Sequence, residues 1–310
     1  MHINLHLLRL FFTVANVGSF SEAAKHLFIS QPAVSKAVRE LEHQLEIPLI
    51  ERGNRSRRLL LTDNGHALYE HARGIFALEK AALDDLHART GLKRGTLVIG
   101  TSTTIAAYWL APYLADFARD FPDIALEVRV ANTRVICEAL VDCTIDVALV
   151  EGSAGDSRIK VLHWQEDPLT IVVAAHSPLA TQRALSAANL NGQTWLMREP
   201  GSGTREITEQ LFEQYKLVPT KTFELGSNEA IARAVAAGLG MAMLPSVVVE
   251  DLVALKRIST LSLKGVNELS RPLSCLQYRS RALPPAAKIF IKRLYATDVQ
   301  VSTASLRARK

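Results

Sequence analysis

The chain has 310 residues, of which 48% are hydrophobic, and carries a formal net charge of +5. This length favours about two domains, and the hydrophobic share excludes an intrinsically disordered protein. The charge is uneven, because residues 1–94 carry 13 Lys/Arg and 10 Asp/Glu, residues 95–277 carry 15 and 20, and residues 278–310 carry 8 and 1. We therefore expect that only part of the chain contacts a polyanion.

The sequence predicts a soluble cytoplasmic protein with no membrane partner. Its three cysteines, Cys137, Cys143 and Cys275, match no zinc or disulfide pattern, which is typical of a reducing compartment and favours buried thiols. The N-terminus lacks a basic region and a cleavage site, so it is not a signal peptide. The most apolar stretch, residues 234–249, contains two glycines and a proline and is too broken to span a membrane.

Residues 4–44 show three short helical patterns. Gly18 ends the first, Ser19 and Glu22 have the spacing of a capping box for the second, and Ser30 is placed to cap the third. The third pattern buries an apolar side and turns polar residues outward. Two short helices joined by a tight turn predict a helix-turn-helix whose second helix enters a DNA major groove.

An arginine-rich hairpin is predicted next. Residues 47–52 and 57–62 have the pattern of two strands around a turn, and the whole hairpin carries four arginines. A charge run is often only a solvated surface, but directly after a helix-turn-helix it favours a wing along the phosphate backbone.

A long helix is predicted over residues 63–88, with Thr62 as its cap. Its narrow apolar stripe favours self-association over packing on its own body. A dimer would present two recognition helices to two half-sites about one helical turn apart. Residues 91–95 form the expected linker.

At this point the sequence resembles a known family. The run GSFSEAAKHLFISQPAVSKAVRELEHQL, followed by IPLIER and LLLTDNG, resembles the N-terminal domain of LysR-type transcriptional regulators. The sequence departs from the family at Glu46, where Gly is usual, and at Ile50, where Phe is usual. Both positions lie at the entry to the wing.

The resemblance implies a multidomain protein: an all-α-rich winged helix-turn-helix, a long linker helix, and an α/β two-lobed effector domain like periplasmic binding proteins of type 2. It also implies a homodimer or dimer of dimers on a pseudo-palindromic DNA operator, which activates or represses genes together with RNA polymerase. The expected segments are 1–62 for the DNA-binding domain, 63–94 for the linker, 95–300 for the effector domain and 301–310 for a basic tail that is disordered beyond about Gln300. Lobe I comprises 95–165 and 268–300, and lobe II comprises 166–267. The DNA contacts carried over are Ser30, Gln31, Pro32, Ser35, Lys36 and Arg39 on the recognition helix, with Arg52, Arg55, Arg57 and Arg58 on the wing.

The body alternates strand and helix patterns, which predicts a parallel sheet covered by helices. Strands are expected at 96–100, 126–130, 146–150, 169–175, 195–197, 223–225, 242–244 and 273–278, with a final helix at 286–295. The resemblance places the crossings between lobes near 165–168 and 264–272.

Two hydroxyl-rich segments follow strands of the two predicted lobes, where such folds bind ligands. They combine hydroxyls with helix starts, which suits an anion, although simple helix capping is the plain alternative. Glu151 is a weaker candidate near a strand end. The predicted effector-binding residues are Thr101, Ser102, Thr103, Thr104, Asn132, Ser202, Gly203, Thr204, Arg205 and Asn228.

TSTTIAAYWLAP and REPGSGTRE resemble the LysR-type subgroup that includes regulators of sulfur assimilation and carbon fixation. This suggests sulfite, sulfate, or a phosphorylated or carboxylated metabolite as effector, with a small inorganic oxyanion preferred because hydroxyls outnumber cations. The body shows no catalytic constellation, metal spacing or cofactor loop, so the protein is expected not to be an enzyme and to need no cofactor. The alternative is a bifunctional enzyme that carries a winged-helix domain.

Overall fold

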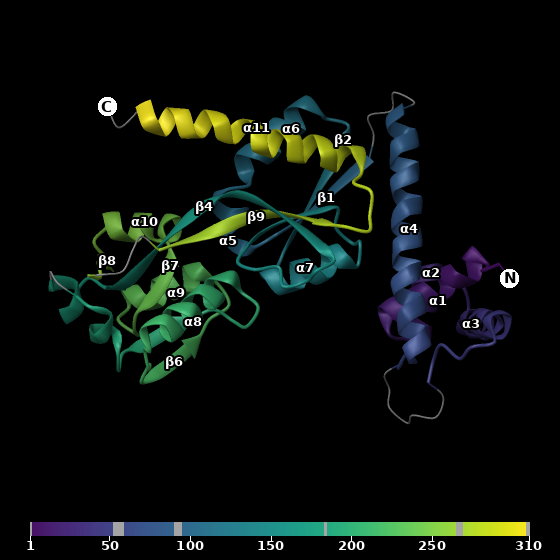
Figure 1. The fold of residues 1–310 in the computed structure, drawn as a ribbon, viewed down its shortest axis with the longest axis horizontal. Helices are drawn as coiled ribbons and strands as arrows, with labels where there is room; N and C mark the ends of the chain where they lie inside the picture. The colour runs from purple at the N-terminus through teal and green to yellow at the C-terminus, as the bar shows by residue number, and fades with distance from the viewer. Residues whose placement is uncertain (1, 52–58, 90–94, 183–184, 265–268, 308–310) are drawn as a thin grey trace. The chain divides into compact units, whose positions relative to one another are not determined.

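The computed structural model describes residues 2–51, 59–89, 95–182, 185–264 and 269–307 (Figure 1). The chain divides into two compact units, Met1–Leu83 and Asp84–Lys310. The division falls inside a long helix, whereas the sequence analysis treats residues 63–94 as a separate linker.

The N-terminal unit begins with three helices, α1 (Leu5–Val17), α2 (Phe20–Leu27) and α3 (Gln31–Leu45), as the capping pattern predicts. Asn4 caps α1 by accepting hydrogen bonds from two backbone amides, and Gly18 ends it in the left-handed conformation at φ 71°. The Ser19 side chain caps α2 by accepting from the Glu22 amide, whereas the Glu22 carboxylate accepts from Lys25 and does not complete the expected capping box. The three helices close on a common apolar core that includes Phe11 and Leu41, both fully buried.

The residue that ends α3 has a strained backbone. Glu46 is the C-cap of α3 and adopts φ 56°, in the left-handed region. A side chain with a Cβ pays about 1–2 kcal/mol for this conformation, and glycine does not. The departure from the family's glycine at this position therefore leaves strain at the entry to the wing.

We expect Glu46→Gly to raise the free energy of unfolding of the N-terminal unit by about 1 kcal/mol, because it removes the left-handed penalty. Native-state hydrogen exchange of the core amides of α1 and α3 measures this. Glu46→Ala is the matched control, since it removes the same carboxylate but keeps the Cβ. Equal stabilisation by both variants would attribute the effect to charge and contradict the strain account.

The long helix α4 (Asp63–Arg89) starts as expected, because the Thr62 hydroxyl accepts a hydrogen bond from the Gly65 amide at 3.0 Å. The first half of its apolar stripe packs into the N-terminal core, with Ala72 fully buried. The second half is exposed: Ile75 and Leu78 are 37% and 60% exposed. Among the described residues, these two side chains begin an exposed apolar strip on α4.

The C-terminal unit is built on a mixed sheet. Its strands are β1 (Gly95–Thr101), β2 (Ile124–Val130), β3 (Val147–Glu151), β4 (Ile159–Ala174), β7 (Ala242–Pro245), β8 (Ile258–Leu261) and β9 (Ser270–Tyr278), in the order β2-β1-β3-β9-β4-β7, with β8 beside β4. The strands β1, β2 and β3 pair in parallel, as predicted. The strand β9 runs antiparallel to both β3 and β4, so in this sheet the expectation of parallel strands holds only for the first three. The separate pair of Thr194–Met197 and Lys221–Glu224 is also parallel.

Two long strands connect the two lobes. The 16-residue strand β4 pairs with β9 up to Pro168 and with β7 from Leu169 onward, so the lobes change over at this point. Only the second half of β4 is predicted from the sequence, because the first half buries few positions and shows little apolar periodicity. The four-residue strand β8 is also missed.

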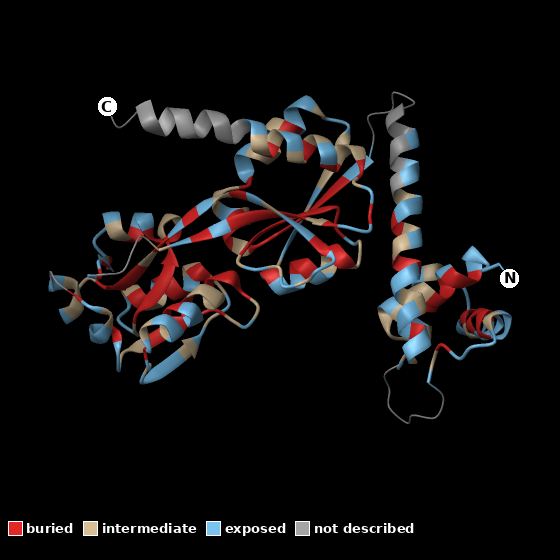
Figure 2. Cartoon of the chain, in the orientation of Figure 1, coloured by how far each residue is buried: buried red, intermediate tan, exposed pale blue. Residues whose placement is uncertain are grey.

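Helices pack on the strands of both lobes. The strands β3 and β7 are buried throughout, whereas β2 has no buried residue and Figure 2 shows the outer strand of the small second sheet, Lys221–Glu224, mostly in pale blue. Lobe I carries α5 (Thr103–Tyr108), α6 (Ala111–Asp120), α7 (Thr133–Val141) and α11 (Pro285–Arg307). Lobe II carries α8 (Gly203–Tyr215), α9 (Asn228–Ala236), α10 (Ser246–Ala254), the two-stranded sheet β5 (Thr194–Met197) and β6 (Lys221–Glu224), and the 3-10 turns η1 (Pro178–Thr181) and η2 (Ala187–Leu190). No helix in the described ranges is long and apolar enough to cross a membrane.

The C-terminal helix differs from the sequence prediction. Disorder is expected beyond about Gln300, but α11 continues to Arg307. After Pro285 the segment contains no glycine or proline, so nothing in its backbone chemistry ends the helix earlier.

Candidate functional site

The recognition-helix residues share one outward face of α3. Ser30, Gln31, Pro32, Lys36 and Arg39 are exposed and Ser35 is partly exposed, as the predicted DNA contacts require. The opposite side of α3 is buried in the core of the unit. Ser30 is the N-cap of α3, as predicted, and its carbonyl accepts from the Val34 amide, but its side chain makes no capping hydrogen bond. Its hydroxyl is therefore not used to hold the helix start.

The described part of the predicted wing is short. A single antiparallel bridge joins Ile50 to Leu61, flanked by hydrogen bonds from the Glu51 amide to the Leu60 carbonyl and from the Thr62 amide to the Leu49 carbonyl. Two longer strands are expected at 47–52 and 57–62, but in the described residues of these ranges the structure contains only this bridge. The wing arginines, Arg52, Arg55, Arg57 and Arg58, lie outside the described residues.

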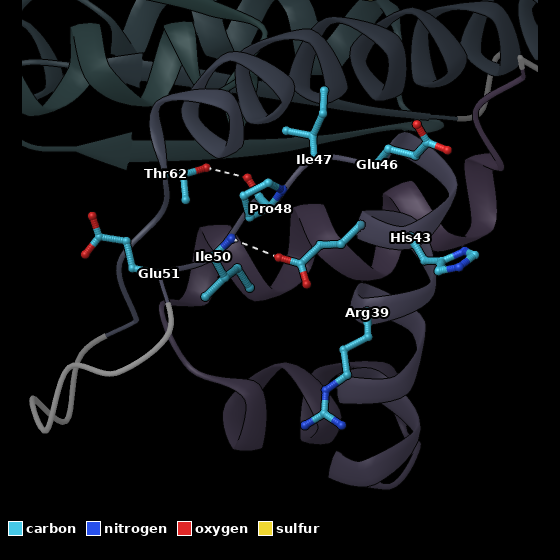
Figure 3. A pocket seen from close by; sticks show the side chains of 9 residues that line it. Arg39, His43, Glu46, Ile47, Pro48, Ile50, Glu51 and Thr62 are labelled. Carbon is cyan, nitrogen blue, oxygen red and sulfur yellow. Dashed lines mark hydrogen bonds between the residues drawn. The ribbon is translucent and has the colours of Figure 1, made fainter.

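A buried carboxylate ties the base of the wing to α3. Glu42 is 8% exposed, and its Oε1 accepts hydrogen bonds from the amides of Leu49 and Ile50 at 2.8 and 3.2 Å. Beside it runs a groove of about 730 Å³ between α3 and the bridge (Figure 3). The sequence reasoning missed Glu42, although an acidic residue four positions after the buried Val38 on an amphipathic helix was a usable signal.

In the C-terminal unit, several predicted hydroxyls meet where the lobes contact each other. Asn228, at the start of α9 in lobe II, donates through Nδ2 to the Thr104 hydroxyl at 2.8 Å and to the Thr204 hydroxyl at 3.3 Å. Thr104 belongs to lobe I and Thr204 to lobe II. All three side chains are at least 98% buried. The structure thus links both hydroxyl-rich segments through one amide.

The start of α8 leaves polar atoms unused. Ser202 is the N-cap of this 13-residue helix and is 4% exposed, yet in the described residues its hydroxyl has no hydrogen-bond partner. The Oδ1 of Asn228 is likewise buried without a partner among them. At Gly203, a Cβ would collide with the backbone of Glu151, so only glycine allows α8 to approach lobe I this closely.

Two other predicted effector-binding residues cap helices, and a third is buried. The Ser102 hydroxyl caps α5 by accepting from the Ile105 amide at 3.3 Å, and Asn132 caps α7 by accepting from the Val135 amide at 3.1 Å. The Thr101 side chain is fully buried and donates only a 3.5 Å hydrogen bond to a neighbouring carbonyl. Helix capping, the plain alternative, therefore accounts for part of the set.

The Arg205 guanidinium makes its hydrogen bonds to residues of its own lobe, lobe II. Its Nε donates to Glu209 at 2.7 Å, and its Nη1 donates to Glu224 and to the Arg198 carbonyl, both at 3.0 Å. The hydrogen bond to Glu209 raises the pKa of Arg205, so the guanidinium stays charged and paired. Its role as an effector ligand stays a prediction, and the structure gives it two carboxylate partners instead.

Two buried arginines that the sequence reasoning did not assign lie at the lobe contact. Arg271 of β9 is fully buried and donates through Nε to Asp167 of β4 at 2.9 Å and through Nη1 to the Thr204 hydroxyl at 2.7 Å. The Glu151 carboxylate approaches Arg271 at 3.4 Å. Burial raises the pKa of Asp167, against the lowering effect of Arg271.

The second arginine forms a network across the lobes. Arg198, which follows β5, binds Glu199 through two hydrogen bonds and donates to the Thr103 hydroxyl at 3.3 Å. Glu199 also accepts from Asn132 Nδ2 at 3.3 Å. No local pattern in the sequence around residues 198–200 indicates that Arg198 is buried.

Cys137 and Cys275 are buried, as predicted, whereas Cys143 is only partly buried. Burial raises the pKa of Cys137 to about 11 and that of Cys275 to about 12, so neither thiol forms a reactive thiolate near neutral pH. Within the described ranges, no group of three His, Cys, Asp or Glu side chains is arranged to hold a metal ion.

Two family models match the chain. The model for the bacterial regulatory helix-turn-helix protein of the lysR family matches residues 5–66, and the model for the LysR substrate binding domain matches residues 90–297. The chain belongs to the LysR family of transcriptional regulators. This LysR-family protein therefore binds DNA through α1–α3 and carries an effector-binding domain. Because the family consists of regulators and not of enzymes, membership excludes the bifunctional-enzyme alternative.

The LysR-family protein is similar to named relatives along its whole length. It is 30% identical to the RuBisCO operon transcriptional regulator of Allochromatium vinosum over 94% of this chain and 95% of that one, which supports the predicted likeness to carbon-fixation regulators. Its fold matches full-length OxyR of Pseudomonas aeruginosa with a TM-score of 0.73 and 22% identity, covering 95% of each chain. The regulatory domain of Synechocystis CcmR in complex with 2-PG matches with a TM-score of 0.61 and 24% identity, covering 66% of this chain and 97% of that one.

Proposed function

We propose that this regulator is switched by a small anion bound between its lobes, at the start of α8 and beside Asn228. The observation that carries the proposal is the pair of buried polar atoms without partners, Ser202 Oγ and Asn228 Oδ1, next to the N-terminus of a 13-residue helix. Buried polar groups are rarely left unsatisfied, and a helix N-terminus favours an anion. Any oxyanion can accept a hydrogen bond from the Ser202 hydroxyl, and a protonated one such as hydrogensulfite would also donate to Asn228 Oδ1.

The side chains at the contact between the two lobes favour some classes of effector over others. Hydroxyls and amides outnumber cations, and Arg271 is already paired with the fully buried carboxylate of Asp167. This favours a small oxyanion such as sulfite or sulfate over a highly charged ligand. A phosphorylated or carboxylated metabolite is the alternative, and the CcmR regulatory domain, which was solved with 2-PG, supports that class.

We infer that the effector acts through self-association. The exposed apolar side chains on the second half of α4, Ile75, Leu78, Leu83 and Leu86, supply a dimerisation strip. Such a dimer, or a dimer of dimers, would place two recognition helices on the half-sites of a pseudo-palindromic operator. The anion must bind the alternative assemblies unequally in order to shift them. RNA polymerase is then the partner through which transcription changes, in the cytoplasm.

Calorimetric titration of sulfite, sulfate and 2-phosphoglycolate tests the anion site. The wild type is expected to bind at least one of these anions. Asn228→Asp keeps the shape of the side chain but adds a negative charge, so its affinity should fall more than about tenfold through like-charge repulsion. Asn191→Asp is the matched control, because Asn191 Oδ1 is an exposed acceptor for the Val218 amide and an aspartate keeps that bond. Equal affinities of the wild type and Asn228→Asp would refute the proposed site.

A further inference from the structure

The carboxylate of Glu199 is held as a bound anion would be. Arg198 donates to it through Nε at 2.8 Å and through Nη2 at 2.9 Å, a two-point contact. Asn132 Nδ2 adds a third donor at 3.3 Å from the other lobe. The Arg198 side chain is 99% buried, so this donor set is built into the fold and is not a surface pair.

The two buried arginines at the junction differ in how firmly their partners are held. Asp167, the partner of Arg271, is fully buried on β4, and removing it from Arg271 would leave a charge with no solvent to receive it. Glu199 is 25% exposed and can turn toward water. Arg198 is therefore the buried guanidinium whose carboxylate can be displaced by an incoming anion.

We propose that Glu199 is an internal competitor of the effector: its carboxylate occupies the Arg198–Asn132 donor set, and the anionic effector displaces it. This inference rests on the proposed function and identifies the residue that sets anion affinity. The donors that hold Glu199 are the kind an oxyanion requires, and they come from both lobes. Burial raises the pKa of Glu199, but the hydrogen bond and the charge of Arg198, a backbone amide and Asn132 together lower it below its usual value, so the competitor is ionised at neutral pH.

The competition has a consequence for selectivity. A ligand must offer Arg198 at least what the Glu199 carboxylate offers, which means a negative charge and two acceptor oxygens. Neutral analogues of the same size would not displace Glu199. The competitor thereby restricts the site to oxyanions and carboxylates and keeps their affinity moderate, so that the regulator responds to a rise in concentration.

Calorimetry on the full-length protein tests this with Glu199→Gln, titrated with sulfate and with 2-phosphoglycolate. Removing the competing charge is expected to raise the affinity for the anion about tenfold, which corresponds to about 1.4 kcal/mol. Glu199→Ala should give a gain in the same direction, so the result does not depend on how the new amide is placed. Glu127→Gln is the matched control, because Glu127 pairs with Arg129 on the exposed strand β2 at 2.7 Å.

The outcomes are distinct. Unchanged or weaker anion binding in both Glu199 variants would overturn the inference and make Glu199 a structural link between the lobes. The proposed function would survive that result if the wild type binds anions and Asn228→Asp does not. Failure of every protein, wild type included, to bind either anion would overturn both. A gain in Glu127→Gln equal to that in Glu199→Gln would show a general effect of charge and also contradict the inference.

Discussion

Replacing Arg271 with methionine is expected to lower the free energy of unfolding of the C-terminal unit by about 3–5 kcal/mol. The substitution leaves the fully buried Asp167 carboxylate without its cation, and it removes the shorter of the two hydrogen bonds that the Thr204 hydroxyl accepts. Urea unfolding followed by tryptophan fluorescence measures this directly, because Trp109, Trp164 and Trp195 all lie in this unit.

The loss in Arg271→Met should depend on pH. Burial already raises the pKa of Asp167, and removing Arg271 raises it further. A group whose folded pKa is raised contributes stability below its unfolded pKa and loses that contribution as pH rises through the folded pKa. The variant should therefore be most destabilised at neutral and higher pH, and the deficit should shrink as the pH falls and Asp167 takes up a proton.

Two comparisons separate a buried charge from general damage. Arg271→Met combined with Asp167→Asn should recover part of the stability, since both charges are then gone. Arg129→Met removes a cation whose pair is about half exposed, and it should cost at most about 1 kcal/mol. A double variant no more stable than Arg271→Met would show that the loss comes from packing.

Lys36→Ala and Arg39→Ala are expected to weaken DNA binding by about 1–3 kcal/mol each, which is roughly five- to 150-fold. Both side chains are exposed on the outer face of α3. If the replaced residue contacts a phosphate, the variant should also show a weaker salt dependence. The slope of the logarithm of the binding constant against the logarithm of the salt concentration should be smaller by about one unit. Fluorescence anisotropy, with a DNA fragment that the wild type selects from a randomised pool, measures both quantities.

Arg129→Ala controls for loss of charge in this experiment, because it removes an exposed cation from β2 in the C-terminal unit. It should leave both the affinity and the salt slope unchanged. Wild-type affinity in both Lys36→Ala and Arg39→Ala would mean that this face of α3 does not contact DNA.

The helix-turn-helix could be predicted because its signals are local. Asn, Gly and Ser residues at helix ends, and apolar spacing within each helix, place α1, α2 and α3 within a few residues of their observed bounds. The left-handed end of α3 at Glu46 explains why the departure from glycine in the family motif matters. At this position the residue usual in the family, glycine, is the one that the left-handed backbone favours.

The charged part of the lobe junction could not be predicted in this way. Asp167 and Arg271 are 104 residues apart and face each other only because β4 and β9 pair antiparallel in that register. Arg198 is buried because the lobes meet over it. The hydroxyls of the two candidate segments can be predicted because each segment follows a strand end. Arg205 is predicted as an effector ligand only because it lies next to one segment in the sequence, and in the structure it pairs with Glu209 and Glu224.

The most direct test of the account is the operator affinity of the full-length protein with and without the anion identified by calorimetry, in the wild type and in Asn228→Asp. The account predicts that the anion changes the affinity of the wild type for DNA, whereas Asn228→Asp binds DNA with the same affinity in its presence and absence. An anion that binds the wild type without changing DNA affinity, or that acts equally on Asn228→Asp, would contradict it.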